Sequence, residues 1–367
     1  CMYAGMVAVP VYPLDVFRLR HTLPRLQAIT RDADAPIMLT SVASIGTGSG
    51  LTETLPGSRS KAGPLWELCR QAVIFTDEVG LELAADYRHE YTSGNDLAIL
   101  QYTSGTTDKP RGVALCHRHL LANAQQIYAE YHVPDAVCVF WLPPYHDMGL
   151  VGGLLLPMFA GRQSVLMSPT SFVQQPLAWL QAISKYRGTT TASPNFGYEL
   201  CLRKIADDEL QSLNLTSLRV AISGAEPIRA TTMRRFSSRF AACGFRTSAF
   251  TPAYGMAEAT LAITGKPREQ EPKAFQFNAA SLHGSEHRAL PSDSATPEQS
   301  VEIVSCGAPL DHTELCIVDT KTLNKVEDQT IGEIWVRGPS IADQYWGKPE
   351  LSAATFDARL ADTTGNN

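Results

Sequence analysis

The stretch that decides the fold is LAILQYTSGTTDKPRGVALC, residues 97–116, in which two apolar runs flank a polar loop. Residues 97–104 and 112–116 have the composition of β-strands, and the loop between them has no apolar face to bury. Gly105 and Gly112 permit backbone conformations in which successive N–H groups point toward an anion. The stretch therefore predicts a strand–loop–strand unit whose loop binds a ligand.

The side chains of this loop indicate which ligand. Hydroxyl groups and positive charges are supplied by Thr103, Ser104, Thr106, Thr107, Lys109 and Arg111. Together they suit a polyphosphate. The spacing is not that of the Walker P-loop, which needs GxxxxGK[ST] leading straight into a helix. A plain hairpin turn is the alternative, but six polar or charged side chains between two apolar strands favour phosphate binding.

On both sides of the loop, segments with the apolar periodicity of helices alternate with segments that have the composition of strands. Helices are predicted over 23–34, 117–131, 176–187, 196–206 and 229–244, and strands over 36–41, 72–77, 189–193, 218–224 and 246–255. This alternation favours an α/β fold with mostly parallel sheets covered by helices. After about residue 300 the pattern changes to strands without long helices, over 301–307, 313–319 and 332–346. We therefore expect α/β subdomains over 1–300 and a small β-rich subdomain over 301–367.

Composition narrows the class of protein. The chain has 367 residues, of which 44% are hydrophobic and 19% charged, as in globular proteins. A net charge of −6 argues against nucleic acid or an anionic membrane as the main partner. No run reaches the roughly 18–20 apolar residues that span a bilayer. Residues 1–13 lack a signal-peptide pattern, and the eight cysteines include no CxxC pair, so reduced thiols in a cytoplasm are expected.

Further motifs follow the phosphate-type loop in a characteristic order. They are WLPPYHDMGLVGGLL (141–155), SPNFGYELC (193–201), ISGAEP (222–227), AYGMAEATL (253–261) and GEIWVRGPSIADQYW (332–346). With YTSGTTDKPRGV, this set resembles the acyl-adenylate-forming superfamily, which includes acyl-CoA synthetases, nonribosomal peptide adenylation domains and luciferases. The motifs at 141–155 and 193–201 look specifically like those of fatty acyl-AMP ligases. The resemblance covers nearly the whole chain and implies the large N-terminal domain of these enzymes.

The resemblance implies an ATP site with Mg²⁺. The loop at Thr103–Lys109 would hold the phosphates, while Gly224, Ala225 and Glu226 would line the adenine side. Glu226 would accept from the adenine amino group, or else cap the helix that starts near Ile228. The remaining nucleotide-binding residues would be Tyr254, Gly255, Met256 and Ala257. Many relatives have Thr where Ala257 stands. The ring of Tyr254 suits stacking on a purine, and the carboxylate of Glu258 suits Mg²⁺, which takes one or two protein carboxylates.

His146 is the expected catalytic residue. Its neighbour Asp147 suggests acid–base chemistry, but no nucleophile motif accompanies the pair, and adjacent residues in a strand point to opposite sides. The resemblance places His146 near the acyl carboxylate and the α-phosphate as an orienting group. The apolar side chains that follow, Met148, Leu150, Val151 and Leu154–Leu156, would line an acyl tunnel or form core. In CHRH (116–119), His117 and His119 are interpreted as helix-terminus residues rather than metal ligands.

These features predict ATP-dependent activation of a fatty acid to an acyl-adenylate, with release of pyrophosphate. The acceptor would be an acyl carrier protein or a polyketide synthase module. The alternatives are a fatty acyl-CoA synthetase and a non-catalytic nucleotide- or acyl-binding fragment. The polar, Ser- and Pro-rich residues 278–300 lie where acyl-AMP ligases carry an insertion, which favours the first choice.

The resemblance also implies that the chain is partial. The start of the fold would precede Cys1, and the ribose aspartate and the swivelling domain with its catalytic lysine would lie beyond Asn367. The chain as given is therefore expected to adenylate little.

Overall fold

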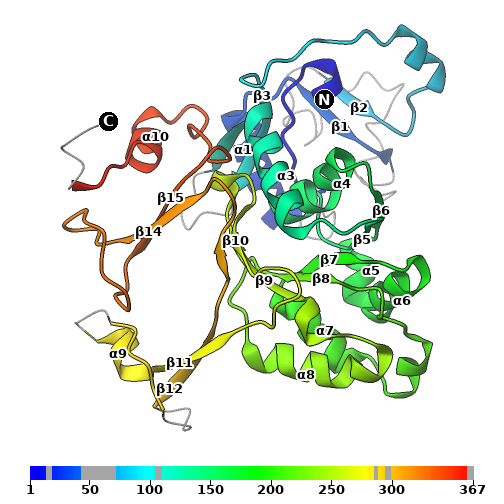
Figure 1. Cartoon of the computed structure of the whole chain (residues 1–367). Helices are drawn as coiled ribbons and strands as arrows, with labels where there is room; N and C mark the ends of the chain where they lie inside the picture. Colours follow the sequence, from blue (N-terminus) through cyan, green and yellow to red (C-terminus); the bar gives the residue numbers. More distant parts are fainter. Residues whose placement is uncertain (14–18, 43–71, 104–109, 285–287, 294–298, 362–367) are drawn as a thin grey trace. The chain divides into compact units, whose positions relative to one another are not determined.

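The computed structural model of the chain describes residues 1–13, 19–42, 72–103, 110–284, 288–293 and 299–361 (Figure 1). The chain divides into two compact units. Unit 1 contains Cys1–His117 and Ala342–Phe356, and unit 2 contains Arg118–Ile341 and the described residues from Asp357 onward.

Unit 1 is built on two small sheets. Its helices are α1 (Leu19–Asp32), α10 (Pro349–Phe356) and the 3₁₀ turns η1 (Met2–Ala4) and η4 (Leu81–Asp86), and its strands are β1 (Ile37–Thr40), β2 (Ala72–Phe75), β3 (Leu97–Thr103) and β4 (Arg111–Cys116). β1 and β2 pair in parallel, whereas β3 and β4 form an antiparallel pair in which Thr103 lies opposite Arg111. The two predicted strands that flank the loop are thus confirmed. Its loop residues Ser104, Gly105, Thr106, Thr107 and Lys109 lie outside the described residues.

A segment from near the end of the chain completes this hairpin. The N–H of Ala114 donates to the carbonyl of Gln344 at 3.0 Å, and the N–H of Trp346 donates to the carbonyl of Gly112 at 2.8 Å. Only Glu333–Arg337 of the predicted strand segment 332–346 forms a regular strand, β15. Its last residues are also paired, since Tyr345 forms an isolated antiparallel bridge with Val113 of β4.

Unit 2 contains a seven-stranded sheet in the order β13-β10-β9-β8-β7-β5-β6. The strands are β5 (Val137–Phe140), β6 (Gln163–Leu166), β7 (Thr190–Ser193), β8 (Val220–Ser223), β9 (Phe250–Gly255), β10 (Ala262–Gly265) and β13 (Ala308–Pro309). β5 to β9 pair in parallel, and β10 and β13 are antiparallel. The predicted mostly parallel sheet is confirmed.

Helices cover this sheet. They are α3 (His117–Tyr131), α4 (Leu156–Phe159), α5 (Pro169–Gln174), α6 (Leu177–Tyr186), α7 (Asn195–Lys204) and α8 (Ala230–Phe240), with a π-helix η5 (Met148–Leu155) and the 3₁₀ turns η6 (Asp208–Ser212), η7 (Ala241–Cys243), η8 (Thr247–Ala249) and η9 (Ala257–Ala259). The pattern of α8 explains its packing, because Met233, Phe236 and Phe240 recur at helical spacing and are buried. The Phe236 ring lies 5.2 Å from that of Tyr198 on α7 and 5.6 Å from that of Phe250 on β9.

The last part of unit 2 is rich in strands, as predicted. It contains β11 (Ala274–Asn278), α9 (Ala279–His283), β12 (Ser300–Val304), β14 (Glu314–Val318) and β15. β11 pairs with β12 and β14 with β15, both antiparallel. Asn278 lies opposite Ser300, so residues 279–299 leave the hairpin and return to the same point. Two backbone hydrogen bonds join this connection to β11: the N–H of Asn278 donates to the carbonyl of Leu290, and the N–H of Ser292 donates to the carbonyl of Gln276.

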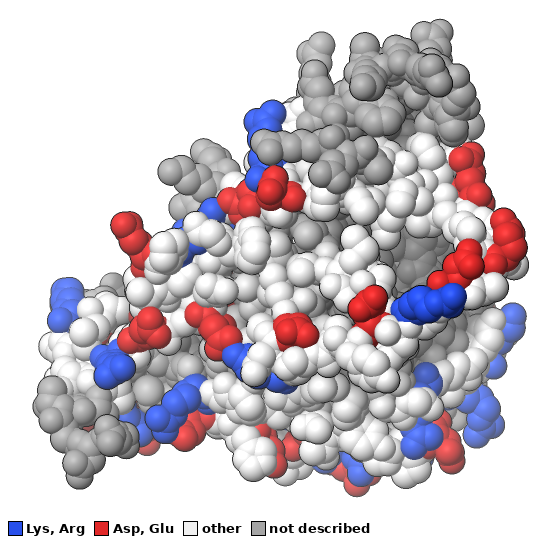
Figure 2. All heavy atoms as spheres, turned by 90° about the horizontal axis from the view of Figure 1, so that it is seen from above, with Lys and Arg blue, Asp and Glu red and all other residues white. Residues whose placement is uncertain are grey.

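The surface carries charges of both signs. Figure 2 shows acidic and basic side chains interspersed on the face that it presents. Among the described residues, no helix combines the length and the apolar character needed to cross a membrane.

Candidate functional site

The predicted site segments of unit 2 follow the carboxyl ends of neighbouring parallel strands. His146 comes after β5, Glu226 after β8, and Glu258 after β9, in a sheet where β5, β7, β8 and β9 lie side by side (Figure 1). Ligands in open α/β sheets bind at this edge, because the loops that leave parallel strands gather there. The topology therefore brings the three segments to one edge of the sheet.

The end of β9 carries Tyr254 and Gly255, and the loop between β9 and β10 carries Met256, Ala257 and Glu258. Tyr254 is half-buried, and burial together with the nearby negative charge of Glu258 raises the pKa of its phenol. The ring therefore stays neutral and lies near a carboxylate. A Cβ on Gly255 would lie 1.8 Å from the carbonyl oxygen of Leu261, so only glycine fits there. Ala257 is 6% exposed and turns its methyl group inward.

In the loop after β8, the carboxylate of Glu226 has a backbone partner that neither prediction included, while its role toward adenine stays a prediction. Its Oε1 accepts the backbone N–H of Phe196 at 2.6 Å, which satisfies a donor at the start of α7. In return, Oδ1 of Asn195 accepts the N–H of Arg229 at 3.0 Å, just before α8. The expectation that Glu226 caps the helix starting near Ile228 was wrong, because the carboxylate reaches the neighbouring helix. Gly224 is buried, and Ala225 is exposed with φ of 64°.

His146 and Asp147 form a contact pair. Nδ1 of His146 lies 2.6 Å from Oδ1 of Asp147, and that oxygen also accepts the N–H of Met148 at 2.6 Å. The hydrogen bond to Asp147 raises the pKa of His146, although partial burial opposes this shift. The expectation that the two side chains point apart was wrong, because they lie in the turn after β5 rather than in the strand. The contact of Asp147 with His146 is thus a feature that sequence reasoning missed.

The apolar residues after this pair form the π-helix η5. Met148 and Val151 are buried, and Leu150, Leu154 and Leu155 are half-buried. A Cβ on Gly149 would lie 2.0 Å from the carbonyl oxygen of Pro143, so the turn that holds His146 packs directly on the helix. π-helices are rare and occur often at functional sites. That these residues line an acyl tunnel stays a prediction.

In unit 1, the described part of the phosphate-type hairpin is anchored at its base. The carbonyl of Thr103 accepts from Nη2 of Arg25 at 3.4 Å. The hydroxyl of the preceding residue, Tyr102, donates to Oδ2 of Asp32 at 2.8 Å, and Oδ1 of Asp32 pairs with Nζ of Lys348 at 2.5 Å. Burial and the Asp32 carboxylate raise the pKa of Tyr102. Asp32 and Lys348 carry no motif that would have identified them.

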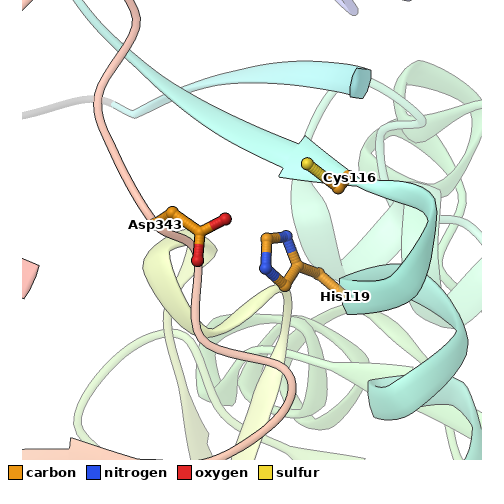
Figure 3. Close-up of side chains that lie close together, drawn as sticks. All are labelled: Cys116, His119 and Asp343. Atoms are coloured by element: carbon orange, nitrogen blue, oxygen red, sulfur yellow. The ribbon is translucent and has the colours of Figure 1, made fainter. Parts of the chain in front are cut away.

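Among the described residues, neither unit by itself offers more than two clustered ligands from or beside the CHRH segment. α3 begins at His117, as predicted, and Nη1 of Arg118 lies 2.9 Å from Nε2 of His119. In unit 1, the Cys116 thiol and the Asp343 carboxylate come within 4.8 Å of each other (Figure 3). A guanidinium beside an imidazole disfavours a cation there, and one thiol with one carboxylate is too few ligands for a metal ion.

Comparisons with known proteins show the family of this chain. The family model described as AMP-binding enzyme matches residues 1–346. A medium-chain-fatty-acid–acyl-carrier-protein ligase, JamA of Moorena producens, is 38% identical over 99% of this chain and 60% of its own length. The 4-hydroxyphenylalkanoate adenylyltransferase of Mycobacterium tuberculosis is 34% identical over 98% of this chain and 56% of its own length.

Among solved structures, a fatty acyl-adenylate ligase from Legionella pneumophila in complex with acyl adenylate and pyrophosphate is 36% identical, with a TM-score of 0.88. It aligns with 100% of this chain, which covers 60% of the ligase. The chain thus spans about 60% of the length of such relatives and has the fold of the N-terminal domain of adenylate-forming enzymes. On the match to residues 1–346, this chain belongs to the AMP-binding enzyme family.

Proposed function

We propose that the full-length protein activates a fatty acid with ATP, forming an acyl-adenylate and releasing pyrophosphate, for transfer to an acyl carrier protein. The observation that carries this proposal is the alignment of the whole chain, at 36% identity, with a ligase solved with acyl adenylate and pyrophosphate. The carrier protein as acceptor is supported by the name of the relative from Moorena producens.

In this reaction the fatty-acid carboxylate attacks the α-phosphate of ATP. The requirement is positioning and neutralisation of charge rather than covalent catalysis. The loop Thr103–Lys109 holds the β- and γ-phosphates through hydroxyl, amide and ammonium groups. Gly224, Ala225 and the ring of Tyr254 bind the adenine, with Gly255, Met256 and Ala257 beside them. Glu226 already accepts one N–H at 2.6 Å, so its second oxygen is the one offered to the adenine amino group.

His146 orients the fatty-acid carboxylate. The raised pKa increases the fraction of imidazole that is charged, and the contact with Asp147 at 2.6 Å holds the ring in one orientation. A charged, oriented imidazole attracts the carboxylate and leaves Nε2 to donate toward it.

The residues present fit a magnesium ion. Glu258 offers one half-buried carboxylate on the loop after β9, and Mg²⁺ in nucleotide sites takes one or two carboxylates with water and phosphate oxygens. When bound, the ion would offset charge on the phosphates of ATP. The chain's own contribution is to hold the carboxylate of Glu258 at the edge of the sheet where the other site segments lie.

The test is pyrophosphate exchange and product analysis with the full-length protein over a fatty-acid series, with and without coenzyme A and carrier protein. We expect fatty-acid-dependent exchange without either acceptor, and acyl transfer to the carrier protein. Efficient acyl-CoA formation would replace the proposed acceptor with coenzyme A. ATP binding without exchange for any fatty acid would contradict the proposed reaction.

A further inference from the structure

The loop that carries Glu258 closes through an unusual backbone turn. Thr260 has φ of 71° and ψ of −59°, and the N–H of Leu261 donates to the carbonyl of Ala259 at 2.9 Å. This is a γ-turn with positive φ, a rare and strained conformation. For a β-branched residue a positive φ is a genuine outlier. Such a conformation persists only where surrounding contacts enforce it.

The side chain of Thr260 supplies such a contact. Thr260 is fully buried, and its hydroxyl donates to the carbonyl of Ser340, itself 2% exposed, at 2.8 Å. The two residues are 80 positions apart in the sequence. The hydrogen bond therefore ties the strained turn to a distant and equally buried segment of unit 2.

The residues that follow the turn, Leu261 and Ala262, are also fixed by buried contacts. The carbonyl oxygen of Leu261 packs where a Cβ of Gly255 would lie, at 1.8 Å. The fully buried side chain of Asn123 binds both backbone groups of Ala262: its Oδ1 accepts the N–H at 3.0 Å, and its Nδ2 donates to the carbonyl at 2.8 Å. Glu258 lies between these anchors, in the short 3₁₀ turn Ala257–Ala259. Its backbone position is thus set by the closure at Thr260.

We propose that Thr260 is a positioning residue for Glu258, through the hydrogen bond from its hydroxyl to Ser340. The proposal rests on the proposed function, since it assigns Glu258 to the Mg²⁺ that accompanies ATP. Thr260 is buried and does not touch the nucleotide or the ion. It holds the γ-turn closed, so that the carboxylate of Glu258 is already in place when ATP and Mg²⁺ bind.

The test compares Thr260→Val with Thr260→Ser in the full-length protein. Valine keeps the shape and β-branching but removes the hydroxyl, whereas serine keeps the hydroxyl. Calorimetric titration of ATP over a series of Mg²⁺ concentrations measures how much Mg²⁺ half-maximal binding requires. We expect this requirement to rise about tenfold in Thr260→Val, no more than the smallest usual cost of losing a direct hydrogen bond to a metal ligand, because Thr260 acts on Glu258 only through the backbone. Thr260→Ser should stay close to the parent.

Thr264→Val is the matched control. Thr264 is 6% exposed, and its hydroxyl also donates to a backbone carbonyl, that of Cys306, at 2.8 Å. Both valine variants should lower the melting temperature of the ligand-free protein, but only Thr260→Val should shift the Mg²⁺ requirement. An unchanged requirement in Thr260→Val, or an equal shift in Thr264→Val, would overturn the proposal. If the parent itself shows no Mg²⁺-dependent ATP binding, the proposed function fails instead.

Discussion

At the carboxyl end of β5, one turn of backbone brings the imidazole of His146 within 2.6 Å of the carboxylate of Asp147. The pair lies at the surface, since the His146 side chain is 54% exposed, and its contribution to stability is therefore small. The contact has a larger effect on the protonation of His146 than on stability. The hydrogen bond from Asp147 is the main cause of the raised pKa of His146.

Asp147→Asn should lower the pKa of His146 toward the ordinary histidine value of about 6.5. The pKa is raised in the folded state, so the stabilisation from this pair is complete below the ordinary value and disappears as pH rises through the raised one. The variant should therefore lose more stability at acidic than at alkaline pH. NMR titration of the imidazole resonances of His146 in both proteins measures the shift. An unchanged His146 titration would contradict the assignment.

Glu258 supports a second prediction at this scale. Glu258→Gln keeps the shape of the side chain but removes its charge, so full-length protein should need more Mg²⁺ for half-maximal pyrophosphate exchange. Glu269→Gln changes another glutamate of unit 2, whose side chain is 77% exposed, and should leave the requirement unchanged. If the magnesium titration of Glu258→Gln overlays that of the parent, the carboxylate has only a structural role.

At the scale of elements, the π-helix η5 and the turn before it form one packed structure. Gly149 lies where the backbone of Pro143 passes, with its carbonyl oxygen 2.0 Å from the position of an added Cβ. Gly152 lies three residues later in the same helix, and an added Cβ would meet only the flexible end of Leu261, at 3.5 Å. The two glycines differ in what surrounds them rather than in sequence context.

Gly149→Ala should therefore destabilise the protein by about 1–3 kcal/mol, the usual cost of overpacking, because a backbone carbonyl cannot move aside easily. Gly152→Ala should be neutral or stabilising by up to about 1 kcal/mol, since alanine favours helices over glycine. Urea denaturation of both variants measures the difference. Equal effects would show that η5 does not pack on the His146 turn as described.

At the scale of the whole molecule, residues 279–299 connect β11 to β12 but are not part of the ladder between these strands. Asn278 lies opposite Ser300, so an Asn-Gly turn can replace the segment without breaking the β11–β12 ladder. The deletion also removes the bonds from residues 290 and 292 to β11, which leaves one edge of that strand exposed.

If this segment is the insertion of acyl-AMP ligases, the full-length protein should use coenzyme A poorly and the shortened variant should form some acyl-CoA. Thioester formation and pyrophosphate exchange are measured side by side. Thioester formation reports whether coenzyme A is accepted, and pyrophosphate exchange reports whether adenylation still occurs. The variant Ser292→Pro controls for the loss of edge pairing, because proline lacks the N–H that donates to Gln276 while the rest of the segment is kept. Efficient acyl-CoA synthesis by the parent would assign the protein to acyl-CoA synthetases.

The sequence by itself determined the local elements and the chemical content of the site. The strand–loop–strand unit at 97–116 and helix α3 were predicted from local patterns, because apolar periodicity reports which face of an element is buried. The ordered motifs identified the segments that carry His146, Glu226 and Glu258. The assignment of these segments to phosphate, base and metal rests on the resemblance of the ordered motifs to a known family and stays a prediction.

Tertiary structure alone decided which groups these side chains meet. Glu226 binds the N–H of Phe196, 30 residues away, and Thr260 binds the carbonyl of Ser340, 80 residues away. Such contacts depend on which strands become neighbours and on where each loop turns back, and neither is encoded in local periodicity. The residue type shows which chemistry a carboxylate or hydroxyl in a motif can perform. Its hydrogen-bond partner depends on how segments that are distant in sequence are arranged in three dimensions.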